Sequence, residues 1–598
     1  MNIPLQGLFV SGDPLSLFFL AVIALVSLPS LVYAAGYLRG HYSAGRIRLC
    51  AVLAGLFVLS MAAVVCAGNI LVFLVAWELM SLISFFLVTF DHEQAQAVRA
   101  GLVYIVMTHA GTALLIAAFM IMYSFAGSWD FAAAQSACRV MPPAVRDLVF
   151  IFLFLGFGTK AGIVPLHVWL PIAHPQAPSH ISSIMSGVMI KTAIYGMIRF
   201  IIQILGVSQT WWGIGMLAVA GTTCLVGVIY ALMDHDLKKV LAYSSVENVG
   251  IVLLGVGACV LFLSLNLPVL AVLALAAGLY HLINHAAFKG LLFLAAGSVY
   301  KATGTRDMEK LGGLIKTMPR TAVYFLIGAL AISAIPPLNG FVSEWLTLQV
   351  FFRGAWGVPA GGLRLFLGIC AAVLALTGGL AVACFVKAFG ISFLALPRSA
   401  AAENATEAPG SMQAGMFILS ACVVLLGLCA APVFKILVFV AGQALSLETS
   451  GVRGLVPILS VPLLTLLLLG AGVAAFVLWH PRKRVVGRTW DCGYYKLDSR
   501  NEYTAMAQSR PFRIAFGFFL LPYQRTQRIR ESFYHFTSFV YETHTTPVFR
   551  KYLYRPLIAG VFRTASSMKR LQAGSIHLYI GYIFVTLVAL LMMIDKFR

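Results

Sequence analysis

The chain has 598 residues, of which 60% are hydrophobic and only 11% are charged, and its mean hydropathy is +0.92. Soluble domains carry about 25% charged residues, so this composition excludes a large water-exposed globule. Apolar runs recur between residues 14 and 480, and they are too long and too continuous to be strands of a membrane barrel. The chain is therefore predicted to be an all-α polytopic membrane protein.

The net charge of +21 is concentrated toward the C-terminus. Residues 481–575 hold 17 Lys and Arg against 5 Asp and Glu. Their position between two apolar runs indicates a cytoplasmic surface that faces anionic lipid or a partner subunit, and no nucleic-acid partner is expected. The ten cysteines lie mostly inside apolar runs and form no CxxC pair, so neither a zinc site nor a disulfide framework is indicated.

Fourteen transmembrane helices are predicted. They span residues 14–37, 48–67, 69–90, 100–125, 147–170, 178–203, 212–233, 239–263, 267–298, 321–352, 363–396, 413–441, 455–479 and 576–596. The resulting domains are an N-terminal helix and loop (1–47), a first five-helix repeat (48–203), a second five-helix repeat (212–396), two further helices (413–479), a basic segment (480–575) and a C-terminal helix (576–598).

The distribution of Lys and Arg predicts an outside N-terminus and a cytoplasmic basic segment. The inside connections would carry Arg39, Arg46, Arg48, Arg99, Lys238, Lys239, Lys301, Arg306, Lys310, Lys316, Arg320 and Arg398. The outside connections would carry Arg139, Arg146, Arg353, Arg364 and Arg453. The first residues lack a positive segment, so no cleavable signal peptide is expected.

Titratable residues inside the apolar runs occur in the same order in two halves of the chain. The pairs are Glu78 with Glu247, His109 with His285, Lys160 with Glu344, and Lys191 with Lys387, at separations of 169, 176, 184 and 196 residues. Five helices are thus followed by five similar ones, and because five is odd the second set enters the bilayer from the opposite side. Inverted repeats are typical of transporters, whose pathway lies near the midplane.

Two helices are expected to be broken beside their charges, at Lys160 and Glu344. The helix-breaking residues are Pro165, Pro336, Pro337 and Gly340. Proline removes a helical hydrogen bond, and non-helical backbone at membrane depth is tolerated where it lines a cavity. Both breaks are therefore expected to line the pathway.

Ten titratable residues within the apolar runs define a predicted proton pathway. They are Glu78, His109, Lys160, Lys191, Glu247, His281, His285, Lys289, Glu344 and Lys387. His281, His285 and Lys289 recur at i, i+4 and i+8, on one stripe of a helix. Buried lysine and glutamate change protonation readily, which suits them to exchange protons.

Other interpretations of the charges stay open. Buried charges can be structural ion pairs, and His281 with His285 could begin a metal site. No cysteine or second histidine pair accompanies them, so no metal is expected. The charges expected to reach the membrane interface from helix ends are Asp234, Asp236, Lys238, Lys239 and Arg199.

Several long motifs resemble one family of membrane subunits. They are "WELMS", "FGTKAGIVPLHVWLPIAHPQAPSH", "DLKKVLAYSSVENVGI", "YHLINHAAFKGLLFLAAGSV" and "PPLNGFVSEW", within a resemblance that covers about residues 14–480. The family comprises the antiporter-like proton-translocating subunits of respiratory complex I, Mrp cation/proton antiporters and group 4 membrane-bound NiFe hydrogenases. "SVENVGI" and the tail motif "TWDCGYY…NEYTAMAQSRPFR" resemble the branch of hydrogenase-4 component B and formate hydrogenlyase subunit 3.

The resemblance implies a proton-translocating subunit with no catalytic site and no cofactor of its own. Redox chemistry in a peripheral arm would drive translocation in a bacterial or archaeal plasma membrane. The implied partners are other membrane subunits, the NiFe large and small subunits, iron–sulfur proteins and the lipid bilayer. By position, Glu78 would pair with Lys160, the central lysine of the first half-channel.

For the second half, the resemblance implies that Lys191 connects the repeats through His285 and Lys289. Glu344 and Lys387 would belong to the exit path. The family core usually begins with two further helices before the counterpart of residues 14–37. The tail from residue 511 to the last helix is expected to include an amphipathic helix along the membrane surface.

Three alternative functions stay open. The chain could be an antiporter-like subunit of complex I proper, or an Mrp-type antiporter subunit. The accessory C-terminal domains of the large Mrp subunit are not recognised here, which disfavours the latter. It could also be a non-pumping scaffold whose buried charges are structural ion pairs.

Overall fold

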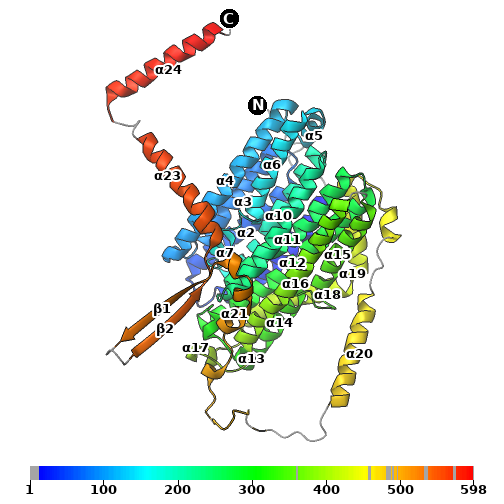
Figure 1. Ribbon diagram of the computed structural model, residues 1–598, viewed down its shortest axis with the longest axis vertical. Coiled ribbons are helices and arrows are strands. Elements are labelled where there is room, and N and C mark those ends of the chain that lie inside the picture. Colours follow the sequence, from blue (N-terminus) through cyan, green and yellow to red (C-terminus); the bar gives the residue numbers. More distant parts are fainter. Residues whose placement is uncertain are drawn as a thin grey trace. The chain divides into compact units, whose positions relative to one another are not determined.

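The computed structural model describes residues 13–358, 361–454, 460–479, 487, 490–494, 496–530, 536–569 and 574–596. The chain forms two compact units, Met1–Arg510 and Pro511–Arg598. In the first unit, long helices lie side by side in a bundle (Figure 1). The predicted all-α polytopic fold is therefore confirmed for this unit.

The first unit begins with α1 (Pro14–Tyr37), whose N-cap Asp13 accepts a hydrogen bond from the backbone N–H of Ser16 at 3.0 Å. The elements of the first repeat are α2 (Ala44–Cys66), α3 (Ile70–Val88), α4 (Ala95–Ala126), α5 (Phe131–Val140), α6 (Pro143–Ala161), α7 (Leu170–Ala173), α8 (Ser179–Ile184), η1 (Met185–Met189), α9 (Ile190–Gly196) and η2 (Met197–Leu205). The last four are continuous and form one span, Ser179–Leu205.

The second repeat has a similar order of elements. They are α10 (Thr210–Met233), α11 (Leu237–Ser264), α12 (Pro268–Thr303), η3 (Met308–Lys310), α13 (Leu314–Thr317), α14 (Pro319–Ile332), α15 (Asn339–Gly357) and α16 (Gly361–Phe393). Asp236 caps α11 by accepting hydrogen bonds from the backbone N–H groups of Lys238 and Lys239.

Both predicted helix breaks are present. α6 ends at Ala161, its C-cap Gly162 has a φ of +81°, and residues 163–169 lead irregularly to the short α7. In the second repeat, residues 333–338 separate α14 from α15. The peptide bonds Val164–Pro165 and Pro336–Pro337 are cis. Each repeat thus contains non-helical backbone beside one of its charged residues.

The core of the bundle lies around α11 and α12. In their most apolar windows, 94% and 83% of the residues are buried, against 39% for α2 and α4. α10 packs closely on α11, because a Cβ at Gly227 would overlap the backbone nitrogen of Glu247. The outer helices of the first repeat keep one face exposed in the isolated chain.

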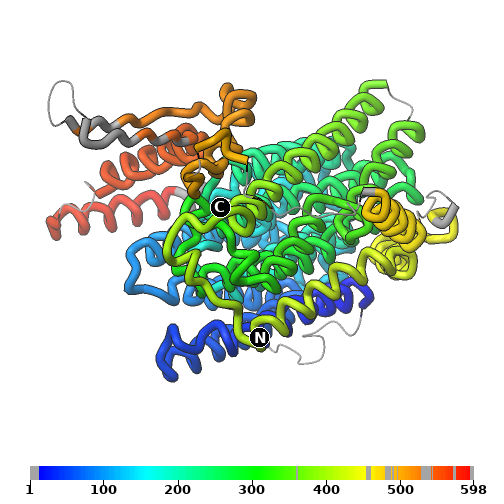
Figure 2. Tube along the Cα trace, turned by 90° about the horizontal axis from the view of Figure 1, so that it is seen from below, coloured from blue at the N-terminus to red at the C-terminus, as the bar shows by residue number. Residues whose placement is uncertain are grey.

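The rest of the first unit holds α17 (Ala400–Glu403), α18 (Gly410–Leu428), α19 (Ala430–Leu445), η4 (Ser450–Gly454), α20 (Val461–Trp479), η5 (Ser499–Asn501) and the start of α21 (Ala505–Ala515). The helix predicted at 413–441 is interrupted at Cys429 into α18 and α19. α1 lies beside α18 on one side of the bundle (Figure 2).

The second unit contains α22 (Gly517–Leu520), strands β1 (Tyr523–Arg530) and β2 (Phe536–His544), η6 (Arg550–Tyr554), α23 (Arg555–Lys569) and α24 (Ile576–Lys596). β1 and β2 pair antiparallel, with Tyr523 opposite His544. The two strands occupy part of the stretch that was expected to include an amphipathic helix, and α23 follows them. Tyr, Phe, Val and Thr in this stretch favour strands.

Eleven helices among the described residues are long and apolar enough to cross a membrane. Three shorter apolar helices are Pro319–Ile332, Ala430–Leu445 and Ile576–Met592. The fifth and tenth predicted spans, 147–170 and 321–352, contain the two breaks beside the charges, so neither is a single long helix.

We predict that Gly340→Ala destabilises the folded protein at the break between α14 and α15. A Cβ at Gly340 would overlap the carbonyl oxygen of Ala331, which is backbone and cannot rotate away. The overlap should cost about 1–3 kcal/mol and lower the thermal unfolding midpoint in detergent. Gly379→Ala is the matched control, since no heavy atom lies within 4 Å of its added Cβ. Equal midpoints for the two variants would contradict this account of the break.

Candidate ion-translocation site

The first cluster of polar side chains surrounds Lys160 at the end of α6. Its buried Nζ donates to Ser81 Oγ of α3 at 2.9 Å and to Tyr104 OH of α4 at 2.7 Å. The same Nζ lies 4.9 Å from the centroid of the Tyr104 ring. Tyr104 OH also lies 2.5 Å from Ser84 Oγ. Two neighbouring helices therefore hold one ammonium group with hydroxyls.

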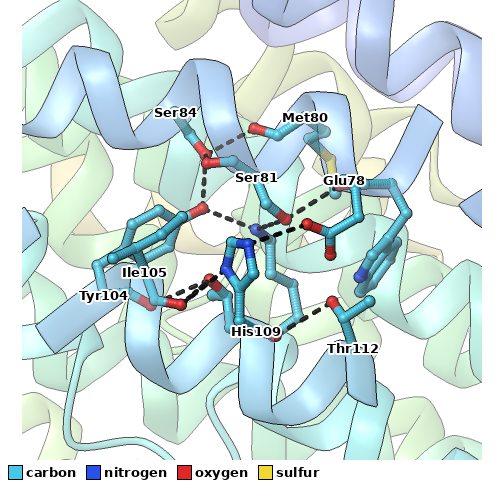
Figure 3. A network of polar contacts seen from close by, with 11 residues as sticks. Glu78, Met80, Ser81, Ser84, Tyr104, Ile105, His109 and Thr112 are labelled. Carbon is cyan, nitrogen blue, oxygen red and sulfur yellow. Dashed lines mark hydrogen bonds and ion pairs between the residues drawn. The ribbon is translucent and has the colours of Figure 1, made fainter. Parts of the chain in front are cut away.

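The ion-pair partner of Glu78 is His109 (Figure 3). Its Oε2 lies 3.3 Å from His109 Nε2, and His109 Nδ1 lies 3.0 Å from the carbonyl oxygen of Ile105. The charges of Glu78 and Lys160 interact, but these two described residues form no direct ion pair. The side chains of Glu78 and His109 are 35% and 53% exposed. The pair therefore lies on an outer face, midway along α3 and α4.

Lys191 lies in α9, between the π-helical segments η1 and η2. Its buried Nζ donates to the carbonyl oxygen of Ser186, 2.5 Å away in the same span. π-Helical segments are rare and occur mostly at functional sites. The backbone of its own helix thus provides an acceptor for Lys191.

Two histidines of the predicted stripe are fully buried on α12 but differ in their partners. His281 Nδ1 lies 3.0 Å from Ser343 Oγ of α15, and its Nε2 lies 3.2 Å from Asn248 Oδ1 of α11. Both ring nitrogens of His285 lack a hydrogen-bond partner among the described residues. The ring centroids of the two histidines are 6.5 Å apart. A buried imidazole without a partner is costly unless water or an ion completes its hydrogen bonds.

Lys289, one turn further along α12, is held by α11. Its Nζ donates to the carbonyl oxygen of Leu241 at 2.9 Å and to Ser244 Oγ. Its charge interacts with those of Lys191 and Glu247. Lys289 thus interacts electrostatically with Lys191 of the first repeat and with Glu247 of its own repeat.

Glu247 of α11 and Glu344 of α15 belong to the same buried region. Their charges interact, and Oε2 of Glu247 lacks a hydrogen-bond partner among the described residues. An added Cβ at Gly378 would lie 3.2 Å from Glu344 Oε2, so α16 passes close to this carboxyl group. The structure thereby brings four helices of the second repeat together around these two carboxyl groups and Lys289.

Lys387 lies apart from this cluster, near the C-terminal end of α16. Its Nζ donates to the carbonyl oxygens of Leu232 at 2.5 Å and Asp234 at 2.7 Å, where α10 ends. Ser509 Oγ, in the segment that follows η5, lies 3.5 Å from the same nitrogen. Lys387 is therefore bound at one end of the second repeat and not at its centre.

One residue absent from the predicted pathway lies between the two halves. His174, at the end of α7, is fully buried, and both its ring nitrogens lack partners among the described residues. Its ring lies 5.7 Å from Trp169, which lies 5.0 Å from Tyr104. The charge of His174 interacts with that of Lys191. The sequence feature that could have identified His174 as a pathway residue is its position in the segment interrupted by prolines.

Two charges expected at the membrane interface have protein partners. Lys238 is only 2% exposed, and its Nζ donates to the carbonyl oxygen of Ala177 at 3.0 Å. Arg199 pairs with Asp13 at 2.8 Å. Both side chains thus have acceptors within the protein, and their position at the membrane interface stays a prediction. No metal-binding group of three His, Cys, Asp or Glu was found among the described residues.

The chain is similar to known membrane subunits along most of its length. Residues 67–372 match the family described as NADH:quinone oxidoreductase/Mrp antiporter, transmembrane. Hydrogenase-4 component B of Escherichia coli (strain K12) is 40% identical over 97% of this chain and 88% of its own length. Formate hydrogenlyase subunit 3 of the same organism is 38% identical over 73% of this chain and 70% of its own length.

A solved structure shares the fold. A chain of the membrane-bound sulfane sulfur reductase, an archaeal respiratory membrane complex, has a TM-score of 0.79 to this chain. The alignment covers 97% of this chain and 88% of that one, at 23% sequence identity. The likeness of fold thus extends over nearly the whole chain.

We predict that Tyr104→Phe lowers stability, because it removes one of the two hydroxyls that hold Lys160. Loss of a hydrogen-bond partner for a buried charge should cost about 1–3 kcal/mol. The measurement is the thermal unfolding midpoint of the purified protein. Tyr123→Phe is the control, since the Tyr123 ring stacks on Trp129 with 4.4 Å between centroids and phenylalanine keeps that contact. A midpoint that falls equally in both variants would argue against a special role of the Tyr104 hydroxyl.

Proposed function

Because the chain belongs to the NADH:quinone oxidoreductase/Mrp antiporter family of transmembrane subunits, we propose that it translocates protons within an energy-converting redox complex. The proposed complex is of the membrane-bound NiFe hydrogenase or formate hydrogenlyase type, in line with the relatives that match most of the chain. Electron transfer elsewhere in the complex would drive ion movement through this subunit, which is proposed to hold no cofactor of its own.

One observation carries the proposal. Lys160, Lys191 and Lys289 are buried, and each donates to hydroxyl or carbonyl oxygens. None of the three forms a direct ion pair with a carboxylate in the described part of the chain. A structural ion pair would hold a lysine permanently charged, whereas neutral acceptors leave it able to release its proton. This arrangement favours a proton pathway over a scaffold of ion pairs.

The proposed route starts at the Glu78–His109 pair and passes to Lys160. From there it would run past His174 to Lys191. In the second repeat it would continue through His281, His285 and Lys289 to Glu247 and Glu344, with Lys387 at one end. Pro165, Pro336, Pro337 and Gly340 would keep the backbone open beside the route.

Water is proposed to connect these side chains. The ring nitrogens of His174 and His285 lack partners among the described residues, and buried water commonly completes such hydrogen bonds. Both histidines interact electrostatically with Lys191 and Lys289. A proton held on one of these lysines would therefore disfavour a proton on its neighbour and help to move charge stepwise.

The exposed Glu78–His109 pair is proposed to face another membrane subunit. A charged pair facing hydrocarbon midway along a transmembrane helix is costly, and such residues almost always face protein or a water-filled cavity. In the isolated chain, the side chain of Glu78 is 35% exposed and that of His109 is 53% exposed. A neighbouring subunit that covers α3 and α4 would remove this cost and continue the route.

The proposed orientation places the N-terminus outside a bacterial or archaeal plasma membrane. Cations gather at one end of the bundle, where Lys301 Nζ donates to the carbonyl oxygens of Gly36, Tyr37 and Arg39. Arg306 pairs there with Asp236 at 3.3 Å. An end rich in Lys and Arg is expected on the cytoplasmic side, which supports this orientation.

We predict that Lys160→Met leaves the complex assembled but lowers ion translocation per electron by at least about tenfold. Methionine keeps the length of the side chain and removes the charge, and a relay group typically contributes that much or more. Assembly is measured by yield of the affinity-purified complex, and translocation by the pH gradient formed in proteoliposomes. Lys316→Met, at an exposed position, is the control.

A scaffold role makes the opposite prediction for the same variant. Lys160→Met would then reduce the yield of complex while translocation per assembled complex stayed unchanged. That outcome would overturn the proposed function.

We predict that gentle purification through a tag on this subunit recovers a NiFe large subunit with iron–sulfur proteins. Mass spectrometry of the purified complex identifies the partners. Recovery of NADH-dehydrogenase or quinone-site subunits would move the chain to complex I. Recovery of antiporter subunits without redox proteins would favour an Mrp-type antiporter driven by an ion gradient.

A further inference from the structure

The second repeat is closed at one end by residues 502–510, which we call the clasp. The clasp follows η5 and includes the first turns of α21. Its Ala505 and Ser509 are fully buried, although residues 496–501 before them are mostly exposed. The clasp therefore docks on the bundle and is not simply a connection to the second unit.

Polar contacts anchor the clasp at its N-terminal end. Glu502 pairs with Arg398 at 3.4 Å and accepts a hydrogen bond from the backbone N–H of Leu396 at 3.1 Å. Arg398 also donates to the carbonyl oxygen of Tyr503 at 3.1 Å. The backbone N–H of Met506 donates to Glu309 at 2.7 Å. These contacts tie the clasp to the loops that follow α16 and α12.

The other end of the clasp reaches Lys387. Ser509 Oγ lies 3.5 Å from Lys387 Nζ and donates to the carbonyl oxygen of Leu232 at 2.8 Å. Leu232 and Asp234 provide the two shorter acceptors of the same ammonium. A lysine ammonium has three N–H donors, and Leu232, Asp234 and Ser509 are among the described residues whose oxygens lie around this one. Ser509 thus contributes to the shell of Lys387 beside the end of α10.

We propose that Glu502 and Ser509 are positioning residues that hold Lys387 at the end of α10 and control its access to water. The inference rests on the proposed function, in which Lys387 belongs to the proton route. With the clasp docked, Lys387 is fully buried and cannot exchange protons directly with the solvent. Release of Ser509 would remove one acceptor and open this end of the second repeat.

Cys384 provides a reporter for the test. It lies one turn before Lys387 on α16 and is 1% exposed, so its reaction with a thiol reagent requires this region to open. The experiment treats the assembled complex in membrane vesicles with N-ethylmaleimide. The rate of labelling of the peptide that contains Cys384 is followed by mass spectrometry, with all native cysteines in place.

We expect labelling of Cys384 about tenfold faster in Glu502→Gln/Ser509→Ala than in the unaltered complex, since about one to two hydrogen bonds are lost. Ion translocation per electron should fall in the same variant. Ser509→Thr, which keeps the hydroxyl, should restore slow labelling. Glu403→Gln and Ser264→Ala are the controls, because neither residue contacts the clasp.

The outcomes separate the two proposals. Unchanged labelling of Cys384 in an assembled variant would overturn the clasp proposal. If the double variant fails to assemble, Ser509→Ala alone carries the test, with an expected increase of about threefold. Faster labelling in a complex that never translocates ions would support the clasp and overturn the proposed function instead.

A second, independent feature lies in the second unit. A cavity of about 740 Å³ is lined by Tyr523, Thr546, Pro547, Arg550, Lys551, Tyr554, Arg555 and Ile558. Arg550, Lys551 and Arg555 form no ion pair with any carboxylate whose side chain is described. Residues 511–598 contain 12 Lys and Arg against 3 Asp and Glu, so acceptors are scarce nearby. The cavity is therefore suited to an anion.

The neighbouring groups favour an anion that carries an apolar part. Burial raises the pKa of Tyr554 to about 12, so its hydroxyl stays protonated beside the cations. Pro547 and Ile558 provide apolar wall. α23 continues with exposed Leu557, Val561 and Phe562 among basic residues, the pattern of helices that lie in a membrane interface.

We infer that this cavity binds the head group of an anionic phospholipid. The three cations would contact its phosphate, and the apolar wall would receive the start of its acyl chains. Basic pockets and polybasic segments next to transmembrane helices are recurrent sites for such lipids. Six residues separate α23 from the apolar helix α24, which keeps the cavity in a part of the chain tethered to the membrane.

The test uses the whole complex in nanodiscs that contain phosphatidylglycerol or only phosphatidylcholine, with bound lipid counted by native mass spectrometry. We expect Arg550→Gln/Lys551→Gln/Arg555→Gln to weaken phosphatidylglycerol binding by on the order of a hundredfold, at about 1 kcal/mol per cation. The control Lys316→Gln/Arg353→Gln/Lys569→Gln removes the same charge elsewhere. Equal binding by both variants, displacement by inorganic phosphate alone, or a crosslinked protein segment in the cavity would each overturn the lipid assignment.

Discussion

Buried lysine ammonium groups impose the strongest physical demand on this fold. A cation inside a membrane protein costs several kcal/mol unless the protein provides oxygens for its three donors. Here hydroxyls and backbone carbonyls provide them, at Ser81 and Tyr104 for Lys160 and at Ser186 for Lys191. Neutral acceptors lower the cost of burying the ammonium and leave the lysine able to lose its proton. A carboxylate in direct contact would instead hold the lysine in its charged form.

The departures from ideal helix follow from this need. A regular α-helix uses its own carbonyls in its internal hydrogen bonds, so few are left for a side chain. The π-helical segments on both sides of Lys191, the end of α10 at Lys387 and the breaks near Lys160 and Glu344 all place irregular backbone beside a charge. The distortions therefore occur where a buried polar group needs an acceptor or space.

The two repeats differ in how much of their charge reaches a surface. In the first, Glu78 and His109 lie on an outer face of the isolated chain. In the second, the titratable groups are enclosed by α10, α11, α12, α15 and α16, and Lys387 is covered by Ser509. In the first repeat the exposed charge is thus confined to the Glu78–His109 pair, since Lys160 and Lys191 are as buried as the titratable groups of the second repeat.

The fold class, the order of the helices and the positions of both breaks could all be predicted from the amino-acid sequence. Long apolar runs have only one low-energy structure in a bilayer, and proline interrupts a helix through its own ring. The stripe of His281, His285 and Lys289 could be predicted as well, since a period near four places residues on one face of a helix. The hairpin at β1 and β2 was missed because its aromatic and basic residues are compatible with an amphipathic helix.

The partner of each charge could not be predicted from the sequence and follows from the way the helices pack. The ion-pair partner of Glu78 is His109, Lys238 is buried against Ala177, and His174 joins the region between the two repeats. These contacts connect residues that are distant in the chain, and their geometry depends on how helices rotate and approach one another. The hydroxyls that accept hydrogen bonds from the lysines could not be predicted from the sequence either. A serine or tyrosine in an apolar run has no periodic pattern that marks it as a partner of a lysine.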